Sequence, residues 1–174
     1  MDTTVSLFQQ VLLRLAPQNP DRPIFLLQIS RTLSKRFDRT GQLADLEEAV
    51  LLDREALELL PPSHPNRSTA LHDLAGYLSR RFDRSGQLAD LDEAVFLYRE
   101  ALELRPPSDP NRSRTLHNLA RDLSKRFHQT AQLADQDEAV LLGHEALEQK
   151  PRSRAHPDRS TTLNNLAVAF LIDL

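Results

Sequence analysis

The chain has 174 residues, of which 40% are hydrophobic and 27% are charged, and its formal net charge is −3. It can therefore bury apolar surface, and it is not a disordered acidic or basic tail. The small net charge gives no reason to expect binding to nucleic acid or to an anionic membrane. The absence of cysteine excludes disulfides, thiolate metal sites and a thiol nucleophile, and it fits a reducing compartment.

The N-terminal stretch, from about residue 4 to residue 16, predicts an amphipathic helix rather than a secretory signal. Asp2 stands where a signal peptide would be basic, and Gln9, Gln10 and Arg14 interrupt the apolar residues. No apolar run in the sequence approaches the ~20 residues of a membrane-spanning helix. We therefore expect an intracellular, cytoplasmic protein that does not bind membranes.

One sequence unit occurs three times along the chain. Residues 21–65, 66–110 and 111–157 align with a period of 45 residues, so that Gly41, Gly86 and Ala131 are equivalent. The first two copies agree at about 28 of 45 aligned positions, which is typical of a repeat array. Residues 1–20 match the second half of a unit, and residues 158–174 match the first half. The sequence therefore predicts a single solenoid over residues 1–174.

Each unit predicts two helices that are joined by a short turn. The first helix follows a proline and begins at a residue favoured at N-caps, which is Asp21, Asn66, Asn111 or Asp158. In the central copy one apolar stripe runs to Phe82, and Gly86 is expected to end the helix. The second helix carries another apolar stripe and stops at Pro106. Because such stripes are buried only by stacking on neighbours, the predicted fold is all-α, a right-handed α–α superhelical solenoid of about eight helices.

The sequence closes with the first helix of a further unit, which has no partner helix. Its end is apolar, with Ala169, Phe170, Leu171 and Ile172 in succession. A terminal repeat usually presents a polar outer face. We expect either that the chain is a fragment of a longer array, which we favour, or that another subunit covers this end.

The two stripes resemble the tetratricopeptide repeat (TPR). In the central copy the TPR pattern of large and small apolar residues, followed by Ala, aromatic, Ala and Pro, is matched by Leu71, Leu74, Ala75, Leu78, Ala94, Tyr98, Ala101 and Pro106. The run His156–Ala167 is similar to the kinesin-light-chain type of this repeat, and the long units resemble arrays in fungal multi-domain proteins. The usual unit has about 34 residues, so we expect each helix to be about one turn longer here. At the position of Tyr98 the other copies have Asp53 and Gly143, where we expect weaker packing.

The resemblance implies that the first helices line a concave groove for a peptide or helix. It assigns the groove to the positions between the leucines of L-x-x-L-A and to the next turns of the same face. In this chain the predicted groove residues are Gln28, Arg31, Lys35, His72, Asp73, Arg80, His117, Asn118, Arg121, Lys125, Asn164 and Asn165. Amide side chains suit a peptide backbone because they both donate and accept hydrogen bonds.

Three of these residues, Lys35, Arg80 and Lys125, recur at equivalent places and predict a basic row that favours an acidic ligand. The alternative is that they are solvated residues that complement the helix dipole. The second helices are rich in acids, so we expect basic residues inside the solenoid and acidic residues outside. These acids are Asp45, Glu47, Glu48, Asp90, Asp92, Glu93, Asp135, Asp137 and Glu138.

The sequence offers no catalytic or metal-binding motif. It contains no P-loop, no G-x-S-x-G, no G-x-G-x-x-G and no H-E-x-x-H. His72 and His117 occupy equivalent places in neighbouring units, and we expect them to be exposed residues rather than metal ligands. We therefore predict a protein that is not an enzyme and has no cofactor and no metal.

The leading hypothesis is a non-catalytic scaffold that binds a protein or peptide partner in its groove. A second hypothesis is a structural segment that self-associates through exposed terminal helices. A third is a regulatory array in a larger protein, since some proteins with similar fungal arrays carry a caspase-like or nucleotide-binding domain. The sequence leaves the identity of the partner open.

Overall fold

The computed structural model describes residues 3–14 and 16–149. Every regular element within these residues is an α-helix, so the all-α class is confirmed. The chain divides into two compact units, residues 1–90 and 91–174. The further helix that the sequence predicts from residue 158 lies outside the described residues.

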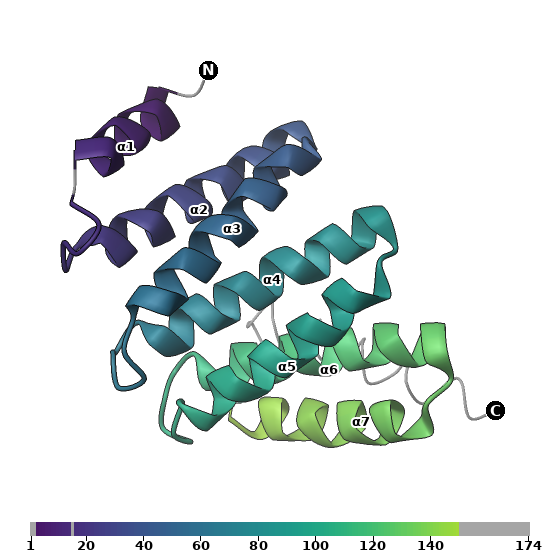
Figure 1. Ribbon diagram of the computed structural model, residues 1–174. Coiled ribbons are helices and arrows are strands. Elements are labelled where there is room, and N and C mark those ends of the chain that lie inside the picture. The colour runs from purple at the N-terminus through teal and green to yellow at the C-terminus, as the bar shows by residue number, and fades with distance from the viewer. Residues whose placement is uncertain (1–2, 15, 150–174) are drawn as a thin grey trace. The chain divides into compact units, whose positions relative to one another are not determined.

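The described helices follow one another without strands between them (Figure 1). The first unit contains α1 (Thr3–Arg14), α2 (Arg22–Thr40), α3 (Leu43–Leu59) and α4 (Arg67–Ser85). The helix α5 (Leu88–Glu103) crosses into the second unit, which also contains α6 (Arg112–Thr130) and α7 (Leu133–Glu148). Consecutive helices pack together, α1 on α2, α2 on α3 and α3 on α4 in the first unit, and α6 on α7 in the second.

The predicted apolar stripes form the core of each unit. On α4, Leu71, Leu74 and Leu78 are at most 2% exposed. On the part of α5 in the second unit, Val95 and Tyr98 are fully buried. Burying a leucine side chain contributes about 1.5–3 kcal/mol, so these stripes are the main stabilising feature of the helix pairs.

The three first helices end in the same way. The residue that follows α2, α4 and α6 is in the left-handed conformation, with φ of 69° at Gly41, 69° at Gly86 and 56° at Ala131. Its N–H donates to the carbonyl oxygen of the phenylalanine four residues earlier, at 2.7–2.8 Å. Glycine adopts this conformation without steric cost, as the sequence predicts for Gly86, whereas Ala131 pays about 1 kcal/mol for it.

The predicted N-caps stand at the expected positions but do not cap their helices. The residues before α2, α4 and α6 are Asp21, Asn66 and Asn111, and none makes a side-chain capping hydrogen bond. The prediction of capping side chains is wrong because these residues already have helical backbone angles, whereas a capping residue is extended. Their own N–H groups instead donate to a side chain two residues earlier, which belongs to Asn19, His64 or Asp109.

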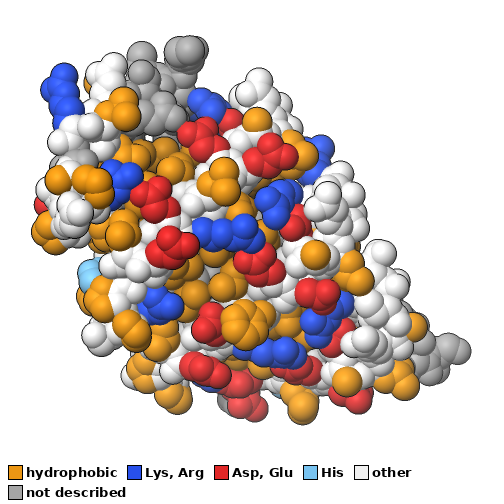
Figure 2. All heavy atoms as spheres, viewed as in Figure 1, with side chains coloured by type: hydrophobic (Ala, Val, Ile, Leu, Met, Phe, Trp, Pro, Cys, Tyr) orange, Lys and Arg blue, Asp and Glu red, His pale blue; other side chains and the backbone are white. Residues whose placement is uncertain are grey.

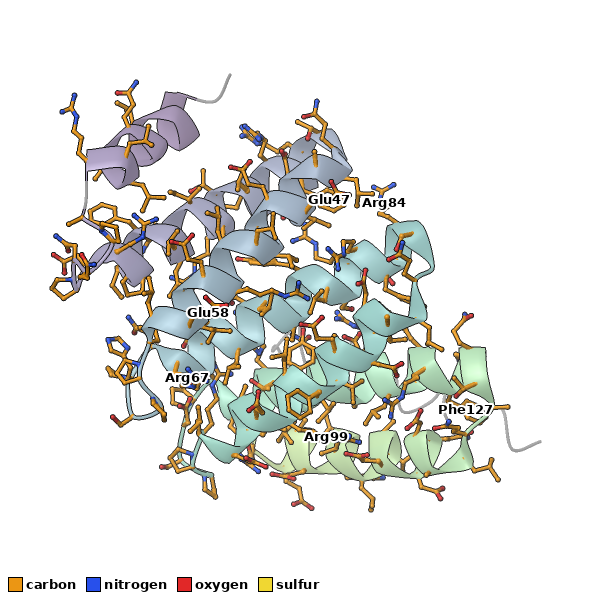
Figure 3. The ribbon with its side chains drawn as sticks, in the orientation of Figure 1. Glu47, Glu58, Arg67, Arg84, Arg99 and Phe127 are labelled. Carbon is orange, nitrogen blue, oxygen red and sulfur yellow. The ribbon has the colours of Figure 1, made fainter. Side chains whose placement is uncertain are left out.

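An arginine at the start of a first helix closes the preceding connection. The guanidinium of Arg67 donates to the carbonyl oxygens of Leu57 (3.0 Å) and Leu60 (2.9 Å), next to the end of α3 (Figure 3). Arg112 bonds in the same way to the carbonyl oxygens of two equivalent residues in the second unit. These carbonyls lie in the last turn of the helix or just after it, where intrahelical donors run out, so the arginines supply a C-terminal cap that the sequence pattern did not reveal.

Each hairpin turn between a first and a second helix is closed by a buried ion pair. Arg36 contacts both carboxylate oxygens of Asp45 at 2.9 and 2.6 Å. The same two-point contact occurs between Arg81 and Asp90 and between Arg126 and Asp135, at 2.6 and 2.7 Å. The three aspartates are only 2–4% exposed. The expected segregation of charge is therefore wrong for Asp45, Asp90 and Asp135, since these acids lie inside the hairpins and not on the outer face.

Candidate peptide-binding surface

The predicted groove residues of α2 lie on one face of the helix. Gln28, Arg31 and Lys35 are spaced by three and four residues, which places them on neighbouring turns of the same side. Gln28 and Lys35 are exposed, and the side chain of Arg31 is 36% exposed. This face of α2 therefore presents an amide, a guanidinium and an ammonium group to solvent.

The ion pair between Arg31 and Asp73 joins this face to α4. The Arg31 Nε atom donates to Asp73 Oδ2 at 2.8 Å, although the two residues are 42 positions apart. Burial lowers the pKa of the Arg31 guanidinium, but the hydrogen bond and the negative charge of Asp73 outweigh this effect, so the pKa is raised overall. Two residues that the sequence assigned separately to ligand binding are thus partners of each other.

Arg80 of α4 is also held against α2. Its guanidinium donates to the Ser34 hydroxyl and to the Asp38 carboxylate, and it lies 4.8 Å from the centre of the Phe37 ring. The guanidinium of Arg84, one turn further on, lies 5.4 Å from the same ring. Arg80 therefore connects two neighbouring first helices through a salt bridge, a hydrogen bond and a cation–π contact.

His72 does not line the surface, because its side chain is buried at 5% exposure. The expectation of an exposed histidine is wrong at this position, where the helix packing turns the residue inward. His117, at the equivalent place on α6, is half-buried. No group of three or more potential metal-binding side chains occurs among residues 3–14 and 16–149.

A buried polar cluster lies next to the pair of Arg31 and Asp73. Asp53 is fully buried on α3, and its Oδ1 atom accepts a hydrogen bond from the hydroxyl of Ser30 on α2. Its Oδ2 atom has no hydrogen-bond partner among the described residues. Burial raises the pKa of Asp53 well above its ordinary value of 3.8. Burial, followed by the charges of Asp53 and Asp73, also raises the pKa of Tyr77.

Sequence reasoning missed this cluster. It treated Asp53 only as a weakly packed replacement for the aromatic residue, although an aspartate within an apolar stripe is itself a signal of a buried polar contact. Ser30 and Tyr77 carry no such signal, because their roles depend on the position of Asp53 in the packed structure.

In the second unit the basic residues of α6 surround a buried acid. Arg121 Nε lies 3.0 Å and Lys125 Nζ lies 3.6 Å from Oδ1 of Asp122, which is fully buried. Asn118 is half-buried, one turn before Arg121. Arg114, which the sequence analysis missed, is exposed one turn before Asn118, and its helical spacing could have revealed it.

Two parts of the predicted groove remain predictions. The row of Lys35, Arg80 and Lys125 draws its residues from both units. Asn164 and Asn165 lie outside the described residues. Among residues 3–14 and 16–149, no helix has the length and apolar character that a membrane span requires.

Comparison with known proteins places the fold. No protein-family model and no curated protein matches the chain. Among solved structures, the chain is similar to a crystal structure of nearly identical TPR-like repeats of a kinesin light chain from Podosopora anserina. The TM-score is 0.67 and the identity 24%, over 97% of this chain and 77% of that chain. The chain therefore has the fold of a kinesin-light-chain-like TPR array, as its sequence pattern indicated.

Proposed function

We propose that the chain is a non-catalytic interaction module that binds a peptide or a helix, preferably an acidic one, on the face that the first helices α2 and α4 form in the first unit. The observation that carries the proposal is the face of α2, where Gln28 and Lys35 are exposed on either side of Arg31. An amide and an ammonium group about two turns apart on one helix face can bind the backbone and a carboxylate of one extended ligand.

The cross-helix contacts support this proposal because they order the surface before a ligand arrives. The Arg31–Asp73 pair and the contacts of Arg80 with Ser34 and Asp38 fix the side chains of α2 and α4. Side chains that are already ordered lose less conformational entropy on binding. Arg80 thus shapes the surface, whereas Lys35 is an exposed cation of the same face.

The test uses peptides selected from a random phage-displayed library on the full chain. We expect the selected peptides to be enriched in Asp and Glu. The variant Lys35→Glu should weaken their binding about tenfold, since a like charge then faces the ligand. Arg14→Glu is the matched control, because Arg14 is an exposed basic residue on α1, outside the face of α2. Equal binding by the wild type and Lys35→Glu would exclude the proposed surface.

A second candidate function is self-association through α1. The side chain of Leu12 on this helix packs against the core of the first unit, yet Leu7 and Leu13 are 63% and 87% exposed. A second copy of the chain is an occupant that can bury exposed leucines of this helix. Sedimentation over a range of concentrations tests this idea, with Leu7→Glu and Leu13→Glu expected to abolish association. A monomer at all concentrations would refute it. The regulatory role within a larger protein stays a prediction, which the reading frame beyond Leu174 tests.

A further inference from the structure

The second helices carry a recurrent exposed pattern that neither the core nor the proposed groove uses. On α5 it consists of Asp92, Phe96, Arg99 and Glu103, all of them exposed. Steps of four, three and four residues place these side chains on one face of the helix. The pattern is thus an acid, a large hydrophobic residue, a basic residue and a second acid on successive turns.

The same pattern occurs on α7, where Asp137, Leu141, His144 and Glu148 are again all exposed. In the first unit Leu51 of α3 occupies the place of the hydrophobic residue. These hydrophobic side chains are far from buried, with exposures of 59% for Phe96, 70% for Leu141 and 65% for Leu51. Single exposed hydrophobic residues are ordinary, but a large one at the same register of α3, α5 and α7 indicates a recurrent apolar surface there.

Within the second unit, the patterns of α5 and α7 belong to one surface. The guanidinium of Arg99 contacts the carboxylate of Glu138 on α7, with Nη2 2.5 Å from Oε2 and Nε 3.2 Å from Oε1 (Figure 3). Arg99 lies one turn after Phe96, and Glu138 lies one turn before Leu141. The ion pair therefore lies between two exposed apolar side chains on adjacent helices.

The surface around these two apolar residues is negatively charged. Its carboxylates include Glu103, Asp137 and Glu148, which are exposed, while Glu138 already occupies the one guanidinium of the two patterns. Acidic, basic and hydrophobic side chains lie side by side over α5 and α7 in Figure 2. An apolar centre with an acidic border complements a helix that carries apolar residues along one face and Lys or Arg residues on either side of that face.

We propose that the outer face of α5 and α7 in the second unit is a docking site for a basic amphipathic helix. Apolar residues of this partner pack on Phe96 and Leu141, and its Lys or Arg side chains pair with Glu103, Asp137 and Glu148. The site is separate from the face of the first helices, and it takes a ligand of opposite charge. One chain thus bridges an acidic and a basic partner.

The test measures fluorescence anisotropy of a labelled peptide with the full chain. The peptide is built from Leu, Ala and Lys, forms about five helical turns, and carries its leucines on one face. A second peptide has the same composition in scrambled order, and a third has Glu in place of Lys. We expect only the first to bind well, with an affinity that falls as the salt concentration rises.

The variants Phe96→Gln and Leu141→Gln should each weaken binding about tenfold, which corresponds to the burial of one large apolar side chain. Leu13→Gln is the control, since Leu13 is also a highly exposed leucine and lies on α1 of the first unit, away from α5 and α7 in the sequence. Glu103→Gln combined with Asp137→Asn should weaken binding and reduce its dependence on salt.

Three results would overturn the proposal. The first is equal binding by the wild type and the Phe96 and Leu141 variants. The second is an equal affinity for the scrambled or the acidic peptide. The third is sedimentation that shows a dimer which Phe96→Gln and Leu141→Gln convert to a monomer, because the surface would then bind a second copy of the chain. Lys35→Glu tests the first-helix face only. It should weaken binding of acidic peptides there without changing the affinity of the basic peptide for α5 and α7.

Discussion

The buried ion pair between Arg126 and Asp135 gives the most informative test of how the hairpins are held together. Arg126 on α6 contacts both carboxylate oxygens of Asp135 at the start of α7, at 2.7 and 2.6 Å. The two side chains are only 16% and 5% exposed. The hydrogen bonds to Asp135 raise the pKa of Arg126 above its ordinary value, so the guanidinium is charged under all ordinary conditions.

We expect Arg126→Ala to lower the free energy of unfolding by about 3 kcal/mol. The removal of one partner of a buried pair leaves an unpaired charge and costs about 3–5 kcal/mol. The lower end of this range applies because the arginine retains some contact with water. The measurement is urea unfolding of the full chain, followed by circular dichroism at 222 nm.

Two controls separate this explanation from a general loss of charge or of packing. Arg99→Ala breaks a pair whose side chains are 45% and 36% exposed, and it should cost no more than about 1 kcal/mol. The double variant Arg126→Met with Asp135→Leu removes both charges and should recover most of the lost stability. The reasoning is refuted if Arg126→Ala costs no more than Arg99→Ala.

Three further predictions follow from single positions. In urea unfolding, Gly86→Ala should destabilise the protein by about 1 kcal/mol and Ala131→Gly should stabilise it by a similar amount. The reason is that both positions have positive φ, and nothing lies within 4 Å of a Cβ at Gly86. A stabilising Gly86→Ala or a destabilising Ala131→Gly would contradict the helix-end geometry. Because burial raises the pKa of Asp53, the folded protein holds the carboxyl proton of Asp53 more tightly than the unfolded chain, so stability falls as the pH rises above about 4. Asp53→Asn should therefore be more stable than the wild type at pH 8 but not at pH 4. Parallel pH profiles of thermal unfolding for the two proteins would disprove this. In urea unfolding, Arg80→Ala should lower the free energy of unfolding by about 1–2 kcal/mol and Lys35→Ala by less than about 0.5 kcal/mol. The reason is that, of the two, Arg80 is bound to a neighbouring helix. Equal losses would show that Arg80 is an ordinary surface residue.

The local elements were predictable because they follow from short-range rules. The period of 45 residues, the apolar stripes of each helix and the left-handed end at Gly86 depend on residues that are near one another in the sequence. The exposed pattern around Phe96 and Leu141 was also open to sequence reasoning, since these residues stand outside the apolar stripes. The all-α class and the TPR-like stacking follow from the repeat alone.

The site was less predictable because burial and pairing depend on a neighbouring helix. The sequence pattern treated Asp73 and Arg31 as independent groove residues, whereas packing of α2 against α4 makes them partners. The same packing places Arg80 against Asp38, and His72 is buried rather than exposed.

By itself the sequence determined that this protein is a helical repeat array and that the leucine and alanine stripes of its helices form the core. Only the tertiary structure decided which charged residues are available to a partner. Asp45 is buried in its hairpin by Arg36, and Asp53 lies unexposed beneath the first-helix face, while Lys35 stays in solvent. The physical reason is that a charged side chain is buried only where a donor offsets its loss of water. For Asp45 and Asp53 this donor comes from another helix, and helix packing decides where it lies.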